Sequence, residues 1–564
     1  MSTVRLVSRR QFVTSGTAAA AAAAFTSLPL PRVEAAPSFD LVLRGGTVLD
    51  GTGGPGFSAD IGLAGDRIAA IGRIAPEQGR AAVDVSGLHV APGFIDIHSH
   101  SDPGILSYPT ADSRVRQGVT TELTGNCGSS AAPLAGMDTE ARRGEWREEG
   151  IEPTWGSVAS YCDLLDRSGI SINQALLVGQ GTLRRNAVGL VDRVLSPDEL
   201  SSVLAAVDDG MAHGAFGLST GLEYVPGRYT PTDEIVAMAR VVARHGGLYA
   251  SHIRNEETQL LEAVSEAIEI GRRAPCRVQI SHLKAAGRVN WSKQQGALDL
   301  IESARRAGVE VLADAYPYTA YSTGLTILLP AAALEGGDPA LFRRLADAGE
   351  RGRLREHLTR QIAQDPGDPS LIVIAQMKTD GDQQYVGRNL AQVAEGWSVE
   401  PAEAVLRLIE RNQGNVPFVG HAMDPANVER VLRHPLVMVG SDGSSMAPVG
   451  RTAQSRPHPR SYGAFARVLA YYCRERRLFD LSEAVRKMTS MPADQIGLRD
   501  RGRLAVGKAA DLVVFDAAEI RDEANFDAPH QYPRGIPHVL VNGTFVVRDG
   551  QHTGARPGRA LRRS

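Results

Sequence analysis

The chain has 564 residues but only four cysteines, little net charge and few long apolar runs. Cys127, Cys162, Cys276 and Cys473 show no close paired spacing, so nothing in the sequence demands a disulfide framework. The formal net charge is −3 and no basic patch is present, which argues against a nucleic-acid partner. After residue 36 no apolar run is long enough to span a membrane, so we expect no stable membrane insertion. A large globular enzyme or binding protein remains.

The first 36 residues have the three-part pattern of an export signal. Ser8-Arg9-Arg10-Gln11-Phe12-Val13 precedes an alanine-dominated run over 16–30, and Val33-Glu34-Ala35 offers a small-residue cleavage site. The alternative is an alanine-rich helix packed on the domain. The order of the three parts favours a twin-arginine signal peptide over 1–36, read by the twin-arginine export machinery. We therefore expect a periplasmic or secreted protein that is exported already folded.

Both ends of the remaining chain predict short β-strands. Runs of apolar residues separated by glycine-bearing turns occupy 41–49 and 61–71, and similar runs return at 512–515 and 539–547. Because the same pattern appears at both ends, we expect residues 37–92 and 500–564 to pair into one small β domain.

Between these ends, eight short apolar runs alternate with helical stretches, which is typical of βα units around a parallel sheet. The expected strands cover residues 93–97, 119–123, 173–178, 215–218, 248–251, 278–281, 309–313 and 436–440. Eight units predict an α/β fold, a (β/α)8 TIM-like barrel over 93–499. The long interval between the seventh and eighth strands predicts an inserted subdomain at about 326–432, placed as a lid over the barrel mouth.

Several of these strands end in side chains that can bind a metal. They are His98, His100, Cys127, His252, His282 and Asp442. A parallel barrel brings the carboxyl ends of its strands together, and imidazole, thiolate and carboxylate are ligands that zinc accepts. Each residue also has an ordinary structural interpretation, but all of them together favour a metal site.

A set of local motifs carries a resemblance to a known family. The motifs are Phe94-Ile95-Asp96-Ile97-His98-Ser99-His100, Gly125-Asn126-Cys127-Gly128, Tyr249-Ala250-Ser251-His252-Ile253-Arg254, Ser281-His282-Leu283-Lys284, Asp314-Ala315-Tyr316-Pro317-Tyr318, Gly440-Ser441-Asp442-Gly443 and His458-Pro459-Arg460. Together they resemble the D-aminoacylase, or N-acyl-D-amino-acid deacylase, family of the amidohydrolase superfamily. Many superfamily members bridge two metals with a carboxylated lysine on the fourth strand, whereas this chain has Ala215-Phe216-Gly217-Leu218-Ser219 there.

The resemblance implies a metal centre with two unequal positions. Cys127, His252 and His282 would hold one zinc ion tightly. His98 and His100 would form a second, weaker position that the cysteine bridges. Three protein ligands leave a fourth position for water, as hydrolytic zinc requires. Asp442 would take the proton of that water and pass it to the departing amine.

Substrate contacts follow from the same resemblance. Tyr316, Ser322 and Arg460 would hold the substrate carboxylate, for which a guanidinium is a matching planar fork. Arg456 competes with Arg460 for this role, and Lys284 is a further candidate for substrate contact.

We thus expect zinc-dependent hydrolysis of the amide of N-acyl-D-amino acids. The alternatives are a relative that cleaves cyclic amides or dipeptides, and a barrel that has lost catalysis and serves as a periplasmic binding protein. Cys127 and the missing fourth-strand lysine argue against the first alternative. Retention of every metal ligand argues against the second.

Overall fold

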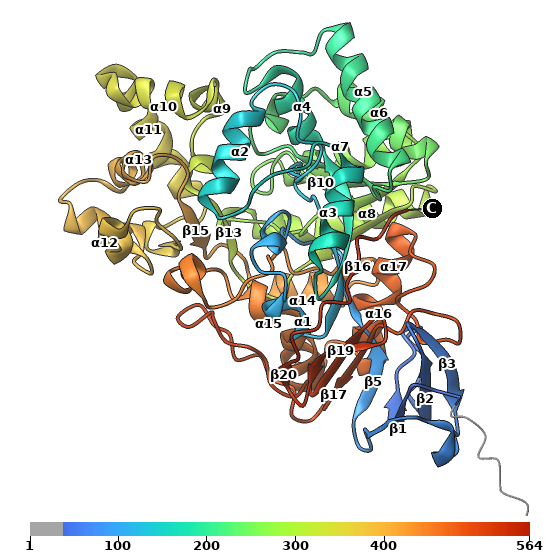
Figure 1. Ribbon diagram of the computed structural model, residues 1–564. Coiled ribbons are helices and arrows are strands. Elements are labelled where there is room, and N and C mark those ends of the chain that lie inside the picture. Colours follow the sequence, from blue (N-terminus) through green and yellow to red (C-terminus); the bar gives the residue numbers. More distant parts are fainter. Residues whose placement is uncertain (1–37, 564) are drawn as a thin grey trace, which may run out of the picture.

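A computed structural model describes residues 38–563, so the predicted export signal lies outside the described residues. At the centre, eight parallel strands pair in the order β6 (Phe94–Asp96), β7 (Val119–Thr124), β8 (Asn173–Gly179), β9 (Gly217–Gly221), β10 (Leu248–His252), β11 (Arg277–Ile280), β12 (Val311–Ala315) and β16 (Val437–Val439). Just beyond the first and last of them, Ser99 forms a parallel bridge with Gly443. This bridge closes the ring, and the expected barrel is confirmed (Figure 1). The fourth and seventh strands begin two residues later than expected.

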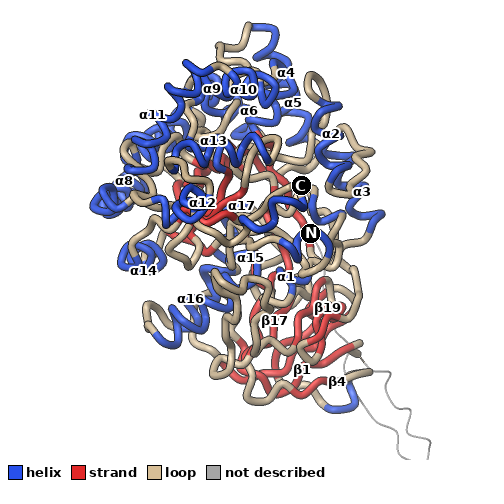
Figure 2. Tube along the Cα trace, turned by 90° about the vertical axis from the view of Figure 1, so that its left-hand side faces the viewer, coloured by secondary structure: helices blue, strands red, loops and turns tan. Residues whose placement is uncertain are grey.

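Helices cover the outside of the barrel, as Figure 2 shows. The main ones are α3 (Val158–Ser168), α4 (Gln180–Val188), α5 (Pro197–Ala212), α6 (Thr232–Arg244), α7 (Leu260–Arg273), α8 (Gln294–Arg306), α14 (Pro425–Arg433), α15 (Arg460–Arg467) and α16 (Leu481–Met488). Helix α5 is capped at its start by Ser196, whose side chain accepts a hydrogen bond from the Glu199 amide. Among the described residues, no helix is both long and apolar enough to cross a membrane.

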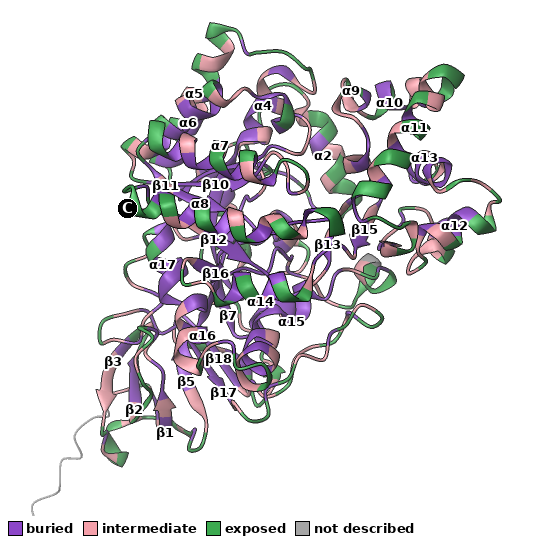
Figure 3. Cartoon of the chain, turned by 180° about the vertical axis from the view of Figure 1, so that it is seen from behind, coloured by how far each residue is buried: buried purple, intermediate pink, exposed green. Residues whose placement is uncertain are grey.

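The barrel interior is filled by apolar side chains from the strands. Leu123, Leu177 and Met438 belong to one buried cluster, which Met491 and Ile496 of α17 (Ser490–Ile496) extend. Figure 3 shows the strands as almost wholly buried. The interior is therefore a packed core, and the polar residues that follow the strands are left at its mouth.

The two chain ends form one nine-stranded sheet. Its strands are β1 (Leu41–Val48), β2 (Phe57–Ala64), β3 (Arg67–Gly72), β4 (Ala82–Asp84), β5 (His89–Pro92), β17 (Leu512–Phe515), β18 (His538–Val541), β19 (Thr544–Arg548) and β20 (Gln551–His552). Strands β5 and β17 pair antiparallel, with Leu512 opposite Pro92, and so join the two ends. The small β domain built from both termini is thus present.

The last residues of the chain leave this sheet and run along the barrel. Gly558 and Ala560 form bridges with Ile170 and Gln174, and Arg562 pairs with Asp166 at 2.8 Å. The expected range of 500–564 places this tail in the β domain, whereas the structure lays it against β8 and α3. The tail ties the two parts together because its backbone pairs with the barrel.

The segment between β12 and β16 has its own small sheet and helices. The sheet has the order β13 (Tyr321–Gly324), β15 (Pro417–Gly420) and β14 (Ile372–Ile374), and the helices are α9 (Ala331–Leu334), α10 (Gly337–Ala346), α11 (Ala348–Gln364), α12 (Leu390–Gly396) and α13 (Pro401–Arg411). This sheet starts at residue 321, a little before the expected 326. Helix α14 already packs on β16 and belongs to the barrel.

Candidate metal centre and active site

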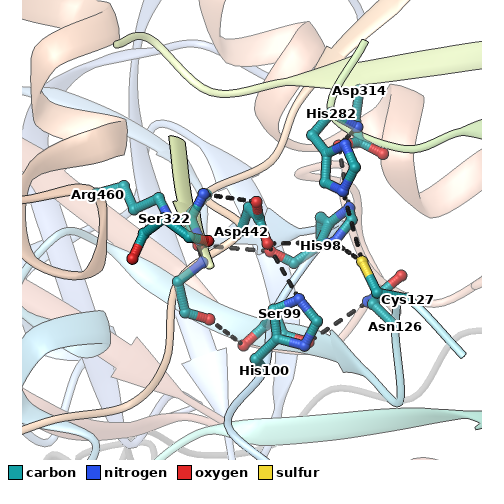
Figure 4. A network of polar contacts seen from close by, with 12 residues as sticks. His98, Ser99, His100, Asn126, Cys127, His282, Asp314, Ser322, Asp442 and Arg460 are labelled. Atoms are coloured by element: carbon teal, nitrogen blue, oxygen red, sulfur yellow. Dashed lines mark hydrogen bonds and ion pairs between the residues drawn. The ribbon is translucent and has the colours of Figure 1, made fainter. Parts of the chain in front are cut away.

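The strand-end residues expected to bind metal converge at the mouth of the barrel. The ligand atoms of His98, His100, Cys127 and Asp442 all lie within 4.8 Å of one another. The same holds for Cys127, His252 and His282. Each group mixes imidazole nitrogen with a thiolate, a donor set typical of zinc. Figure 4 shows Asp442 and Cys127 on either side of His98, with His100 and His282 beside them.

Cys127 belongs to both groups. Its Sγ lies 3.3 Å from Nε2 of His98 and 3.5 Å from Nε2 of His282. Burial opposes ionisation of this thiol, but the imidazoles of His98 and His282 hold the pKa of Cys127 well below its ordinary value. A thiolate between two imidazole clusters fits two metal positions with a shared ligand.

The backbone at three of these residues adopts an uncommon conformation. Cys127, His282 and Asp442 have φ angles of 51°, 36° and 52°, in the left-handed region. Residues other than glycine rarely occupy that region, which costs roughly 1–3 kcal/mol per residue unless the surrounding structure imposes it. Glycines at positions 125 and 128, with φ of 76° and 75°, allow the turn that carries the cysteine. The strained turns aim the three side chains at one point.

Buried carboxylates hold the histidines in place. Asp314 accepts hydrogen bonds from the backbone amide of His282 at 2.9 Å and lies 3.2 Å from Nδ1 of His98. Glu256 lies 2.9 Å from Nδ1 of His282, and its other oxygen pairs with Lys284 at 2.5 Å. A carboxylate on Nδ1 fixes the tautomer that leaves Nε2 free for a metal.

Sequence reasoning gave no role to these supporting acids. Asp314 belongs to the motif Asp314-Ala315-Tyr316-Pro317-Tyr318, which by itself indicates no role for it, and Glu256 and Glu223 lie outside the strand-end pattern. Glu223 lies 3.0 Å from Nε2 of His252. The available signal was position, because Asp314 ends the seventh strand and Glu256 follows the fifth by four residues.

Asp442 lies between a histidine and an arginine. Its Oδ1 is 3.0 Å from Nε2 of His100, and its Oδ2 accepts a hydrogen bond of 2.6 Å from Arg460. Burial raises the pKa of Asp442, but the charges of Arg460 and His98 outweigh it and hold the pKa well below its ordinary value. The carboxylate is therefore ionised and able to accept a proton.

Arg460 also joins the expected substrate contacts. Its second terminal nitrogen donates to the Ser322 carbonyl at 3.2 Å, and its guanidinium lies 5.0 Å from the centre of the Tyr316 ring. The Tyr316 hydroxyl is buried and has no hydrogen-bond partner among the described residues. Arg456, the competing arginine, instead lines a surface cavity beside Gln383. Lys284 pairs with Glu256, and its Nζ also lies 3.0 Å from Nδ1 of the candidate metal ligand His282.

Two cavities open from this centre. The first, here called the acid-lined cavity, has a volume of about 200 Å³ and reaches His252, His282 and Asp442. Its other walls include Glu223, Glu257, Lys284, Tyr321, Leu329 and Asp365. The second, here called the outer cavity, has a volume of about 1010 Å³ and is lined by His100, Cys127, Arg142, Asp338 and Arg460. A substrate bound at the metal centre thus has two directions in which to extend.

Comparisons with known proteins agree with this geometry. An amidohydrolase family model matches residues 81–547. A D-aminoacylase of Alcaligenes xylosoxydans xylosoxydans is 37% identical over 93% of this chain and 98% of its own. An N-acyl-D-glutamate deacylase of the same organism is 38% identical over 93% of this chain and 96% of its own.

Solved structures point the same way. A crystal structure of D-aminoacylase superposes with a TM-score of 0.79 at 36% identity, covering 93% of this chain and 100% of that one. The N-acyl-D-glutamate deacylase of Bordetella bronchiseptica, complexed with zinc and a phosphonate inhibitor, gives a TM-score of 0.80 at 35% identity over the same shares. A D-hydantoinase at 15% identity, with a TM-score of 0.53, shares the fold alone.

Proposed function

The chain belongs to the amidohydrolase family, in its D-aminoacylase branch, and from this premise we propose that it uses zinc to hydrolyse the amide of N-acyl-D-amino acids. The products are a carboxylate and a free D-amino acid. The observation that carries the proposal is the position of Cys127 between two imidazole groups, 3.3 Å from His98 and 3.5 Å from His282, with Asp442 beside them.

The residues present fit zinc in both positions. Cys127, His252 and His282 would hold the tight ion, and His98 and His100 would share the cysteine with a weaker one. When bound, zinc polarises the amide carbonyl and activates water as the nucleophile. Asp442, ionised and in contact with His100, accepts the proton of the attacking water. The same carboxyl group then donates that proton to the departing amine nitrogen.

The substrate carboxylate is anchored on the opposite side of Asp442. Arg460 would offer its guanidinium to the carboxylate, and the ring of Tyr316, whose hydroxyl has no hydrogen-bond partner among the described residues, lies 5.0 Å from it. The Ser322 hydroxyl, which donates to the Phe418 carbonyl at 2.9 Å, stands beside them. The substrate carboxylate and amide are then both fixed. Only one configuration at the α-carbon directs the substrate side chain into the cavity, so the site is selective for one enantiomer.

Two other activities are less well supported. Hydrolysis of cyclic amides has only the fold in its favour, and β9 carries no lysine to bridge two metals. A binding protein without catalysis would not need the ionised Asp442 beside a complete ligand set.

Kinetics with paired substrates test the proposal. Purified protein of measured zinc content is assayed with N-acetyl-D-methionine, its L enantiomer, a hydantoin and a dipeptide of two L residues. We expect rapid release of D-methionine and little turnover of the other three. A preference for the L enantiomer, or for the hydantoin, would overturn the assignment.

We also propose export by the twin-arginine route, supported by the pattern around Arg9 and Arg10. Changing both arginines to lysine should retain folded, active precursor in the cytoplasm, as measured by cell fractionation. Undiminished activity outside the cytoplasm would contradict the proposal. A matched change of Arg5 to lysine should leave export intact.

A further inference from the structure

The acid-lined cavity carries more negative charge than its own cations balance. Five carboxylates line it, and two of them have a cationic partner: Glu256 pairs with Lys284, and Asp442 pairs with Arg460. Of the other three, Glu223 forms an ion pair with His252 at 3.0 Å, whereas Glu257 and Asp365 form no ion pair in the described part of the chain.

The three acids without a lysine or arginine partner come from separate elements. Glu223 follows β9, Glu257 follows β10, and Asp365 follows α11 of the insertion. Glu223 contacts His252 at the inner end of the cavity, and Glu257 accepts a hydrogen bond of 2.7 Å from Asn255. Arg228 also lines the cavity, but its side chain is exposed to solvent. Glu223 is thus compensated by His252 and by the zinc ion that His252 would hold, whereas Glu257 and Asp365 have no cationic partner in the described part of the chain.

Asp365 provides a second, independent observation. The residue is 3% exposed, and its Oδ2 accepts a hydrogen bond of 2.6 Å from Tyr321. Its Oδ1 is buried and has no hydrogen-bond partner among residues 38–563. A buried acceptor without a partner is costly, which indicates that a donor arrives from outside the protein.

The electrostatics of the cavity favour a cation beside Asp365 and Glu257. Burial and the charge of Glu223 raise the pKa of Asp365 to about 7. Burial and the same neighbour raise the pKa of Glu257 well above its ordinary value. A positive group between these side chains would remove the repulsion and satisfy the orphaned oxygen.

Part of the cavity wall is apolar. Ile327, Leu328 and Leu329 of the insertion line the cavity together with the acids. An aliphatic chain ending in an ammonium group matches both parts of the wall, because its methylenes pack on the leucines while its head reaches the carboxylates.

We infer that the acid-lined cavity selects substrates with a primary ammonium group on a short aliphatic stem, held by Asp365 and Glu257. This inference rests on the proposed function, since the ammonium belongs to an N-acyl-D-amino acid bound at the metal centre. It enters on the side chain, as in Nα-acetyl-D-lysine, or on the acyl half, as in a glycyl-D-amino acid. The cavity disfavours anionic side chains.

Four substrates of matched size test the inference. Nα-acetyl-D-lysine is compared with N-acetyl-D-norleucine, which has a similar stem without the charge, with glycyl-D-norleucine, and with N-acetyl-D-glutamate. We expect kcat/KM at pH 8 to favour a cationic substrate over N-acetyl-D-norleucine by about tenfold or more, the scale of one hydrogen bond to a charged group. The first and third substrates distinguish a side-chain ammonium from an acyl ammonium.

Isosteric variants assign the selectivity to the cavity. Asp365→Asn and Glu257→Gln should each lower the ratio of cationic to neutral kcat/KM by roughly fivefold or more, mainly through KM. The matched control is Asp338→Asn, which removes a carboxylate from the outer cavity and should keep the ratio. Rescue by Asp365→Glu would show that the charge matters.

The outcomes separate this inference from the proposed function. Turnover of N-acetyl-D-norleucine without a preference for either cationic substrate overturns the inference alone. An equal drop in the ratio for Asp338→Asn does the same, because the effect would not belong to this cavity. No turnover of any N-acyl-D-amino acid overturns the proposed function.

Discussion

Replacing Arg460 with methionine should damage catalysis in two separable ways. Arg460 is 7% exposed, and its guanidinium donates a hydrogen bond of 2.6 Å to Asp442, which is 8% exposed. Truncating one partner of such a buried charge pair costs roughly 2–5 kcal/mol. The loss corresponds to roughly 30-fold to several thousandfold in kcat/KM for N-acetyl-D-methionine. Methionine retains much of the volume, so the fold should survive, as a thermal melt would show.

The substrate distinguishes the two effects. The C-terminal amide of N-acetyl-D-methionine has no carboxylate to bind, so its hydrolysis should suffer only from the loss of the partner of Asp442. We therefore expect the amide to lose less than the acid when Arg460 is replaced. The same change at Arg456, which lines a surface cavity, should leave both rates unaltered.

The refuting results are specific. An equal loss on acid and amide would mean that Arg460 acts only by holding Asp442 and does not bind the substrate. A loss below threefold on both would refute both roles. Because Arg460 pairs with Asp442 in the structure, we expect some loss of kcat/KM for the amide substrate as well. The sequence did not indicate this loss.

Three further predictions concern the metal, the proton and the fold. Cys127→Ala should lose bound zinc and activity together, and unchanged zinc by elemental analysis would contradict its role as the shared ligand. Asp442→Asn should keep the tight zinc but lower kcat by roughly 100-fold or more, and near-normal turnover would refute proton transfer. Arg114 is fully buried, contacts Asp96 and donates a hydrogen bond of 2.8 Å to Glu122. Arg114→Met should therefore lower the free energy of unfolding, measured by urea titration, by roughly 3–5 kcal/mol. The double variant with Glu122→Gln should lose less than Arg114→Met alone, and equal losses would show that no uncompensated charge is responsible.

Much of the architecture was predictable from local pattern. The eight barrel strands lie within two residues of their expected starts because buried parallel strands are short apolar runs, and that signal is contained in each segment. The C-terminal tail was not predictable in this way. Residues 558–562 have no apolar periodicity, and their place on the barrel depends on pairing with Ile170 and Gln174, nearly 400 residues earlier.

The candidate site likewise has residues that local sequence predicts and residues that it does not. The histidines, Cys127 and Asp442 could be named because each directly follows a strand, and a parallel barrel places all strand ends at one mouth. The choice between Arg460 and Arg456 could not be made, since both lie in one loop-like stretch of the sequence. Only the folded structure shows that Arg460 is the arginine that contacts Asp442.

The sequence by itself determined the barrel, the joined β termini and the candidate metal-binding side chains, because hydrophobic period and donor chemistry are properties of short segments. Tertiary structure alone decided which acids support the histidines and which remain unpaired. Glu223, Glu257 and Asp365 are ordinary surface-type residues when considered one at a time. Their repulsion, and the cation that would relieve it, exist only once strands β9 and β10 and helix α11 meet around one cavity.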